Sequence, residues 1–290
     1  MIIVIGSIIV LASVLCGFSM GGGSVSALMH VSEVIIIGGA AAGSLVIMSP
    51  RKVLIDMGKK AVQALQGSPY SKKSYEELLS ALYEMFLLGR RKGMVPLEEH
   101  VTNPQTSSIF TKYPTFIRNK NAVDFLCNAM QPIVDGRVKN DQLKSLLEVE
   151  LDGLEHELEA PVSVLSKTAD ALPGFGIVAA VLGIVVTMAA IAGPVETVGE
   201  KVAAALVGTF LGILMSYGFV GPLAMKMEFL NSEEMAYFQC IATSIIGFVN
   251  GMAPNMAVET ARRGLNSDMR PSAKELEELT KAVNATVQKG

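Results

Sequence analysis

The sequence has few residues suited to metal binding or redox chemistry. It contains three cysteines and three histidines, all isolated along the chain, and no C-x-x-C pair. This distribution argues against a disulfide framework and against a zinc site. No catalytic constellation is visible either, so we expect neither an enzyme nor a bound metal or cofactor. The formal net charge of −3 gives no indication of nucleic-acid binding.

Long apolar runs, by contrast, are abundant. A helix needs about 20 mostly apolar residues to cross a hydrocarbon core of roughly 30 Å. We therefore predict an all-α integral membrane protein with four transmembrane helices, and we interpret the shorter stretch Ile241–Met252 as a buried helix face. The predicted spans are Met1–Met20, Val34–Ser49, Ala171–Ala192 and Val202–Pro222.

The first apolar segment also has some features of a secretory signal. It lacks a basic n-region, however, and a second apolar segment follows almost at once. Both features favour a retained helix. We therefore expect this segment to be the first of the four spans.

Basic residues are absent from the first 50 positions, although the chain contains 24 lysines and arginines. Positive charge tends to remain on the cytoplasmic side of a membrane. The pattern therefore predicts a transmembrane hairpin at 1–50, a large cytoplasmic helical domain at 51–169, a second hairpin at 170–222, and cytoplasmic C-terminal helices at 223–290. The large domain is thus inserted between the second and third spans.

The predicted cytoplasmic parts have helical periodicity. The segment "SYEELLSALYEMFLLGRRKG" carries apolar residues at i, i+3 and i+4 and ends in three basic residues and Gly93, as a helix C-terminus often does. A new helix should begin at "VPLEEHV", where Glu98 and Glu99 suit a first turn. A charged helix at 140–165 leads to the third span, and the tail "RPSAKELEELTKAV" should be polar and peripheral.

Small residues recur along the third and fourth spans. In lipid, such residues allow helix backbones to approach closely. They predict tight helix pairing, within the chain or between copies. The members are Gly176, Ala180 and Gly183 on the third span, and Ala204, Gly208, Gly212 and Ser216 on the fourth.

Two prolines and one threonine stand out in the same spans. We expect Pro173 in the first turn of its helix, where its missing N–H costs nothing, and we expect Pro222 to loosen the end of the fourth span. Thr209 is the only hydroxyl in the middle of that span. It either bonds to its own helix, as is common, or faces a wet cavity and contacts an ion.

Ionisable residues are missing from the middle of all four predicted spans. A proton or cation relay needs a titratable or charged group at membrane depth. If this chain contributes to an ion path, another subunit must bring the carboxylate.

The third-span motif "DALPGFGIVAAVLG", followed by "LVGTFLGILMSYGFVGPLA", resembles the MotA family of flagellar motor stator subunits, within the wider family of MotA, TolQ and ExbB. The segments "GRRKGMVPLEEHVTNP" and "GMAPNMAVETARR" extend the resemblance over most of the chain. Four predicted spans agree with MotA, because TolQ and ExbB have three.

The resemblance implies a proton-conducting complex in the bacterial inner membrane, whose ion flow generates torque for flagellar rotation and thus for chemotaxis. MotA-like subunits form a ring, expected to be a pentamer, around two copies of a MotB-like partner. That partner supplies the ion-binding aspartate and the peptidoglycan anchor.

The resemblance also assigns residues to the ion path. Pro173 matches the proline beside the partner's aspartate, Thr209 matches the channel threonine, and Pro222 matches the second functional proline. Ala180 stands where sodium-driven relatives usually have a threonine, which favours protons (H+) as the transported ion.

In the cytoplasmic part, Arg90 and Glu98 match charged residues with which the family engages the rotor switch protein FliG. Glu150 matches a further acidic position. The same charges also fit helix termini, where each stabilises by about 0.3–1 kcal/mol. Which member of each group contacts the rotor stays open, because the adjacent positions are also charged: Arg91, Lys92 and Glu99.

Two other functions are compatible with parts of the sequence. An energiser of the ExbB or TolQ kind would use the same ion path to drive envelope proteins, but the first hairpin and the segment from Arg90 to Glu98 argue against it. A passive membrane scaffold would gather cytoplasmic partners and would tolerate substitution of Pro173 and Thr209.

Overall fold

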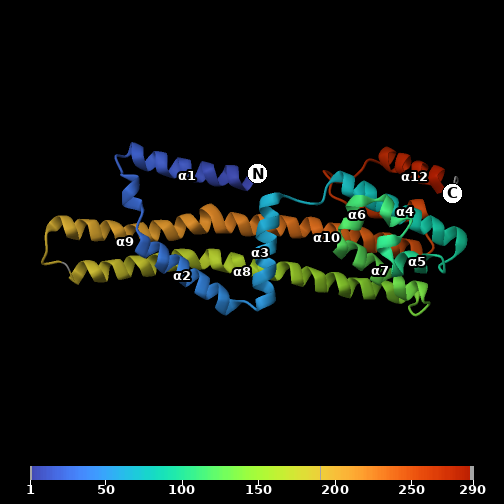
Figure 1. Cartoon of the computed structure of the whole chain (residues 1–290), viewed down its shortest axis with the longest axis horizontal. Coiled ribbons are helices and arrows are strands. Elements are labelled where there is room, and N and C mark those ends of the chain that lie inside the picture. Colours follow the sequence, from blue (N-terminus) through green and yellow to red (C-terminus); the bar gives the residue numbers. More distant parts are fainter. Residues whose placement is uncertain (1, 190, 288–290) are drawn as a thin grey trace. The chain divides into compact units, whose positions relative to one another are not determined.

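The computed structural model describes residues 2–189 and 191–287. Met1 and Ala190, which belong to predicted spans, and positions 288–290 lie outside the described residues. The described chain is helical and contains no strand. It divides into two compact units, namely unit 1 with Met1–Gly67 and Glu157–Leu230, and unit 2 with Ser68–His156 and Asn231–Gly290 (Figure 1).

Unit 1 contains the apolar helices. Four helical segments are long and apolar enough to cross a membrane, which confirms the prediction of an all-α chain with four candidate spans. The elements that contribute to this unit are α1 (Ile2–Met20), η1 (Val25–Leu28), α2 (Val31–Met48), α3 (Arg51–Gln66), α8 (Asn140–Ala189), α9 (Val195–Met215), the π-turn η4 (Ser216–Val220) and α10 (Gly221–Val249).

Small apolar clusters join these helices. In the first, Ile37 and Ala41 of α2 meet Leu172 and Ala179 of α8. In the second, Ala64 of α3 meets residues of α8 and α10. None of the described residues of α1 is buried, although Ile3 packs against the second cluster.

The structure corrects the expected start of the helix that contains Pro173. The charged segment at 140–165 and the apolar segment after it form one helix of 50 residues, α8. Pro173 therefore lies in the helix interior rather than in a first turn, and so does Pro161. The turn chemistry needed to end a helix is absent between the two segments, so the helix continues through both prolines.

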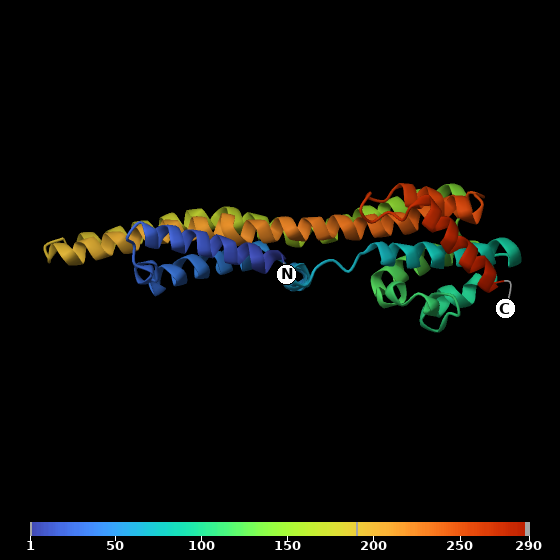
Figure 2. The same cartoon turned by 90° about the horizontal axis from the view of Figure 1, so that it is seen from above.

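Unit 2 is built around α4 (Lys72–Lys92). This helix begins with a capping box between Ser71 and Ser74 and ends at Gly93, whose φ of 84° suits glycine. Figure 2 shows the green segments that follow α4 on one side of it, and α10 and α11 on the other. The remaining elements are α5 (Leu97–Thr102), η2 (Pro104–Thr106), η3 (Phe110–Lys112), α6 (Pro114–Arg118), α7 (Lys120–Val134), α11 (Pro254–Arg263) and α12 (Ala273–Val287).

One large apolar core holds unit 2 together, and α4 contributes Leu78, Leu82 and Phe86 to it. The stretch Ile241–Met252 lies mostly in α10, where its residues up to Val249 supply buried side chains to this core, as predicted. The C-terminal helix α12 is less peripheral than its polar sequence suggested. It buries Leu276 and Val283 in the core, because its narrow apolar stripe finds a partner in α4, far away in the sequence.

Candidate functional site

Helices α8 and α9 approach each other closely enough for their backbones to touch. A β-carbon on Gly176 would lie 2.9 Å from the carbonyl oxygen of Gly208, and one on Gly212 would lie 2.7 Å from the carbonyl oxygen of Leu172. Only glycine fits at such distances, because the obstructing atoms belong to backbone. The interhelical seam is therefore fixed by three glycines that the sequence had marked as small-residue positions.

The other small positions are placed less simply. A β-carbon on Gly183 would lie 2.8 Å from Cβ of Ala205, and one on Gly208 would lie 3.0 Å from Cβ of Ala179. Ala205 and Ala179 are buried, whereas the neighbouring Ala204 and Ala180 are half-buried. The tightest alanine contacts thus come from Ala205 and Ala179, each one position away from an alanine that the sequence analysis assigned to the small-residue face.

Pro173 is half-buried on α8 near this seam. Because proline has no N–H, the carbonyl of Ala169, four residues earlier, lacks its regular helical donor. The hydroxyl of Ser216 donates a hydrogen bond to that carbonyl oxygen over 2.6 Å. Ser216 is the first residue of the π-turn η4, and Pro222 lies exposed two residues after the turn ends.

Thr209 is half-buried on α9, and its Cα would lie 3.3 Å from a β-carbon on Gly176. Its hydroxyl makes no hydrogen bond with the described residues. Thr187 on α8 behaves differently, because its hydroxyl donates to the Gly183 carbonyl oxygen of its own helix over 2.8 Å. Thr209 therefore keeps a free hydroxyl beside the seam.

Asp, Glu, Lys, Arg and His are absent from the apolar stretches 2–20, 34–48, 171–189 and 202–215 of the described chain. The acidic residue of α2, Glu33, lies in the first turn, is buried, and accepts a hydrogen bond of 2.7 Å from Ser32. The sequence analysis assigned no function to this carboxyl, which directly precedes the predicted second span.

The last turn of α4 and the first turn of α5 carry the charges that the sequence singled out in unit 2. Gly89 allows this arrangement, because a β-carbon there would lie 2.9 Å from Cζ of Phe248. The charged side chains are exposed and form no ion pair within the described residues. They are Arg90, Arg91, Lys92, Glu98 and Glu99.

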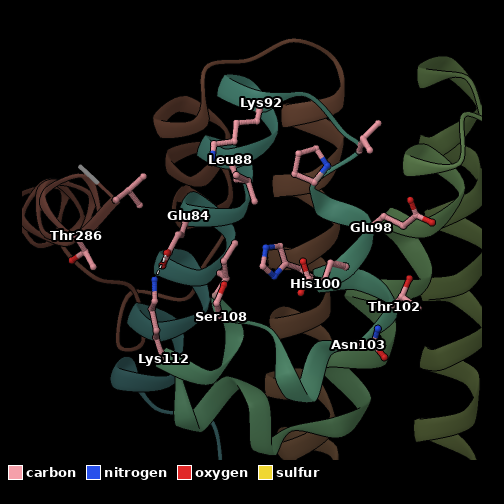
Figure 3. Close-up of a pocket in the computed structure, with 15 residues that line it drawn as sticks. Glu84, Leu88, Lys92, Glu98, His100, Thr102, Asn103, Ser108, Lys112 and Thr286 are labelled. Carbon is pink, nitrogen blue, oxygen red and sulfur yellow. Dashed lines mark hydrogen bonds and ion pairs between the residues drawn. The ribbon is translucent and has the colours of Figure 1, made fainter. Parts of the chain in front are cut away.

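A hollow of about 740 Å³ lies beside these charges (Figure 3). Lys92, Glu98 and His100 contribute to its lining. On the α4 side, Glu84 pairs with Lys112 and also accepts a hydrogen bond of 2.9 Å from the Tyr113 hydroxyl. Sequence reasoning did not find this pair, because its members lie on separate elements.

Burial shifts the pKa of one residue that lines the hollow, His100, and of Tyr113, which contacts the lining residue Glu84. It lowers the pKa of His100, whose Nδ1 lies 2.9 Å from the Ser107 hydroxyl oxygen, and it raises the pKa of Tyr113. Glu150 lies on α8, outside the lining of the hollow, and burial raises the pKa of its carboxyl. No group of three or more metal-ligating side chains occurs among the described residues.

Comparison with known proteins relates this arrangement to a family. Residues 4–93 match the Motility protein A N-terminal family, and residues 118–239 match the MotA/TolQ/ExbB proton channel family. Motility protein A of Salmonella typhimurium (strain LT2) is 37% identical over 283 residues, which cover 98% of this chain and 96% of the relative. These matches are to motility and channel proteins and not to enzymes, in agreement with the sequence.

Two solved structures share the fold. The structure of C. jejuni MotAB superposes with a TM-score of 0.77 at 20% identity, covering 93% of this chain and 98% of the matched one. The flagellar MotAB stator complex of Bacillus subtilis gives 0.71 at 22% identity, covering 89% and 92%. The chain has four candidate spans, a close α8–α9 contact at glycines, and 37% identity to Motility protein A over 98% of its length. It therefore belongs to the Motility protein A family of proton channel proteins.

Proposed function

We propose that this chain is a stator subunit of a bacterial flagellar motor, which conducts protons with a MotB-like partner and generates torque on the rotor. One observation carries the proposal: α8 and α9 pack backbone against backbone, with no Asp, Glu, Lys, Arg or His between positions 171 and 189 of α8 or between positions 202 and 215 of α9. Because a proton relay needs a titratable group at membrane depth, a second polypeptide must supply it. The similarity to MotAB complexes favours a MotB-like chain.

In the proposed topology, 1–50 and 170–222 form two hairpins in the bacterial inner membrane, while 51–169 and 223–290 are cytoplasmic. The absence of basic residues before Arg51 supports this orientation. The compact units divide the chain at other positions, Gly67 and Glu157 among them, because they group residues by contact and not by membrane depth.

The proposed cycle uses the seam residues. A proton enters from outside and neutralises the partner's aspartate beside Pro173, which changes its preference between neighbouring subunits of a ring of five. The ring turns by one step and the proton leaves near Pro222. Each charge that crosses 100 mV supplies about 2.3 kcal/mol. The free hydroxyl of Thr209 supports a polar contact along this path, and Ala180 favours protons over sodium.

The exposed charges of α4 and α5 are proposed to contact the rotor protein FliG. Arg90 and Glu98 form no ion pair within the described part of the chain, so they are available to a partner. Such charge pairs steer and orient weak, repeated encounters. Glu150 is proposed as a further acidic contact.

The test is complementation of a strain that lacks this chain. Restored swimming, co-purification with a single-span peptidoglycan-binding partner, and proton flux only when both chains are present would support the proposal. Proton flux through this chain alone would contradict it. Normal swimming of the deletion strain combined with failed envelope transport would favour an ExbB- or TolQ-like energiser.

A further inference from the structure

We infer that Ser216 is a positioning residue of the proposed ion path: its hydroxyl holds the proline-bearing part of α8 against the π-turn η4 and thereby couples Pro173 to Pro222. This inference rests on the proposed function, because it gives Ser216 a task in the motor cycle.

The first step of the argument concerns the carbonyl of Ala169. In an α-helix this group accepts from the N–H four residues later, which Pro173 lacks. Ser216 supplies the missing donor from the end of α9, over 2.6 Å. The residue is only 1% exposed, so water cannot easily replace the hydroxyl, and a buried carbonyl without a partner is costly.

The direction of this bond is not the default for a helical hydroxyl. Buried serine and threonine side chains in helices commonly bond to the carbonyl four residues earlier in their own helix. Thr168 does so with Val164 over 2.9 Å, as does Thr187 with Gly183. Ser216 instead crosses to the neighbouring helix, to the carbonyl that a proline has left free.

The backbone of Ser216 links the bond to the second proline. The N–H of Gly221 donates to the Ser216 carbonyl, five residues earlier, and so closes the π-turn directly before Pro222. Such one-residue expansions are rare and often lie at functional sites. Ser216 therefore contacts the surroundings of both prolines. Its hydroxyl bonds to the Ala169 carbonyl that Pro173 leaves without a donor, and its own carbonyl closes the π-turn before Pro222.

The backbones of α8 and α9 are in close contact next to Ser216. One turn before Ser216, a β-carbon on Gly212 would lie 2.7 Å from the Leu172 carbonyl oxygen. A movement of α8 at Pro173 is consequently passed to η4 through contact and hydrogen bond together. Loss of the hydroxyl should uncouple the two prolines while the seam itself remains.

The test is a double-mutant cycle in the complex of the full chain with its partner. Pro173→Ala restores an N–H to Ala169, so Ser216→Ala should matter far less in that background. We expect Ser216→Ala alone to lower the Tm of the purified complex by about 2–4 °C and to reduce swimming speed at least about two-fold. In the Pro173→Ala background the Tm shift should fall below half of that. Ser216→Cys, which keeps the shape and a weak donor, should lie between serine and alanine.

Thr168→Val is the matched control, because it removes a buried hydroxyl that bonds only within α8, and it should leave swimming unchanged. Equal Tm shifts of Ser216→Ala in the Pro173 and Pro173→Ala backgrounds would overturn the inference. It would also be overturned if the Tm shift depended on the residue at position 173 but the Ser216→Ala variant swam normally. If the unaltered chain failed to restore swimming, the proposed function would be wrong. The double-mutant cycle measured by Tm would still decide whether the Ser216 hydroxyl links α9 to α8.

Discussion

Gly89 lies directly against the ring of Phe248: a β-carbon on the glycine would be 2.9 Å from Cζ of the phenylalanine. The same β-carbon would be 3.0 Å from Cδ1 of Leu97, the first residue of α5. The last turn of α4 is thus held against both α10 and α5 at the point where its basic residues begin. The placement of Arg90 and Glu98 depends on this absence of a side chain.

Replacement of Gly89 by alanine should therefore weaken the protein without changing any charge. Overpacking of a tight core typically costs about 1–3 kcal/mol, and we expect a lower Tm and slower swimming. Gly153→Ala is the matched control, because Gly153 lies in α8 with nothing within 4 Å of its would-be β-carbon. That change should leave stability equal or raise it by up to about 1 kcal/mol. Equal effects of the two substitutions would contradict the packing argument.

Charge reversal should separate the rotor contact from folding. The double variant Arg90→Glu, Glu98→Lys should assemble normally, because both side chains are exposed, but should lose most swimming. A reversed charge on the rotor protein should partly restore it. Lys120→Glu, at another exposed basic position, should swim normally. Unaltered torque in the double variant would remove Arg90 and Glu98 from the proposed contact.

Removal of the free hydroxyl at Thr209 should impair conduction and spare assembly. Thr209→Val keeps the shape and breaks no hydrogen bond within the described residues, so we expect an unchanged Tm and a several-fold lower proton flux. Thr187→Val removes a hydroxyl that bonds to Gly183 and serves as the control, with normal flux. A motor that runs at full speed with valine at position 209 would favour the passive scaffold.

The transported ion can be tested by gradient. Because position 180 of this chain is alanine, swimming speed should follow the proton gradient and should not depend on the external sodium concentration at constant ionic strength. Cells energised at fixed proton-motive force and measured over a range of sodium concentrations supply the readout. A speed that rises with sodium would overturn the preference for protons.

Stability at low pH should depend on Glu259. Hydrogen bonds from Arg262, and then from Arg263, lower the pKa of this carboxyl to about 2 from an ordinary 4.5. Because the folded pKa is depressed, the carboxylate stabilises the protein above pH 4.5, and this contribution disappears as the pH falls towards 2. We expect Glu259→Gln to cost about 1–3 kcal/mol at neutral pH and almost nothing near pH 2. A pH-independent difference in unfolding free energy would contradict this.

Much of the helical architecture could be predicted, because helix periodicity and apolar length are local properties. The end of α4 at Gly93 is an example, since basic residues and a glycine signal the terminus within a few positions. The continuity of α8 could not be predicted in the same way. Pro173 is compatible with both a first turn and a helix interior, and the hydroxyl that satisfies the Ala169 carbonyl comes from 47 residues later in the chain.

The candidate site shows the same limit. Gly176, Gly208 and Gly212, which the sequence analysis assigned to small-residue faces, lie where the backbones of α8 and α9 touch and leave no room for a β-carbon. The ridge drifts around the helix over several turns, however, so Ala205 and not Ala204 faces Gly183. The Glu84–Lys112 pair and the burial of Leu276 needed the tertiary structure, because their partners are distant in sequence.

Helix α1 has no buried residue among those described, so shape complementarity within this chain places little constraint on its side chains. Substitutions among leucine, isoleucine and valine along α1 should be tolerated as long as the segment stays hydrophobic enough to insert into the bilayer. The sequence of α1 can therefore vary with the lipid composition of the membrane, whereas no larger residue fits at the glycines of the α8–α9 seam.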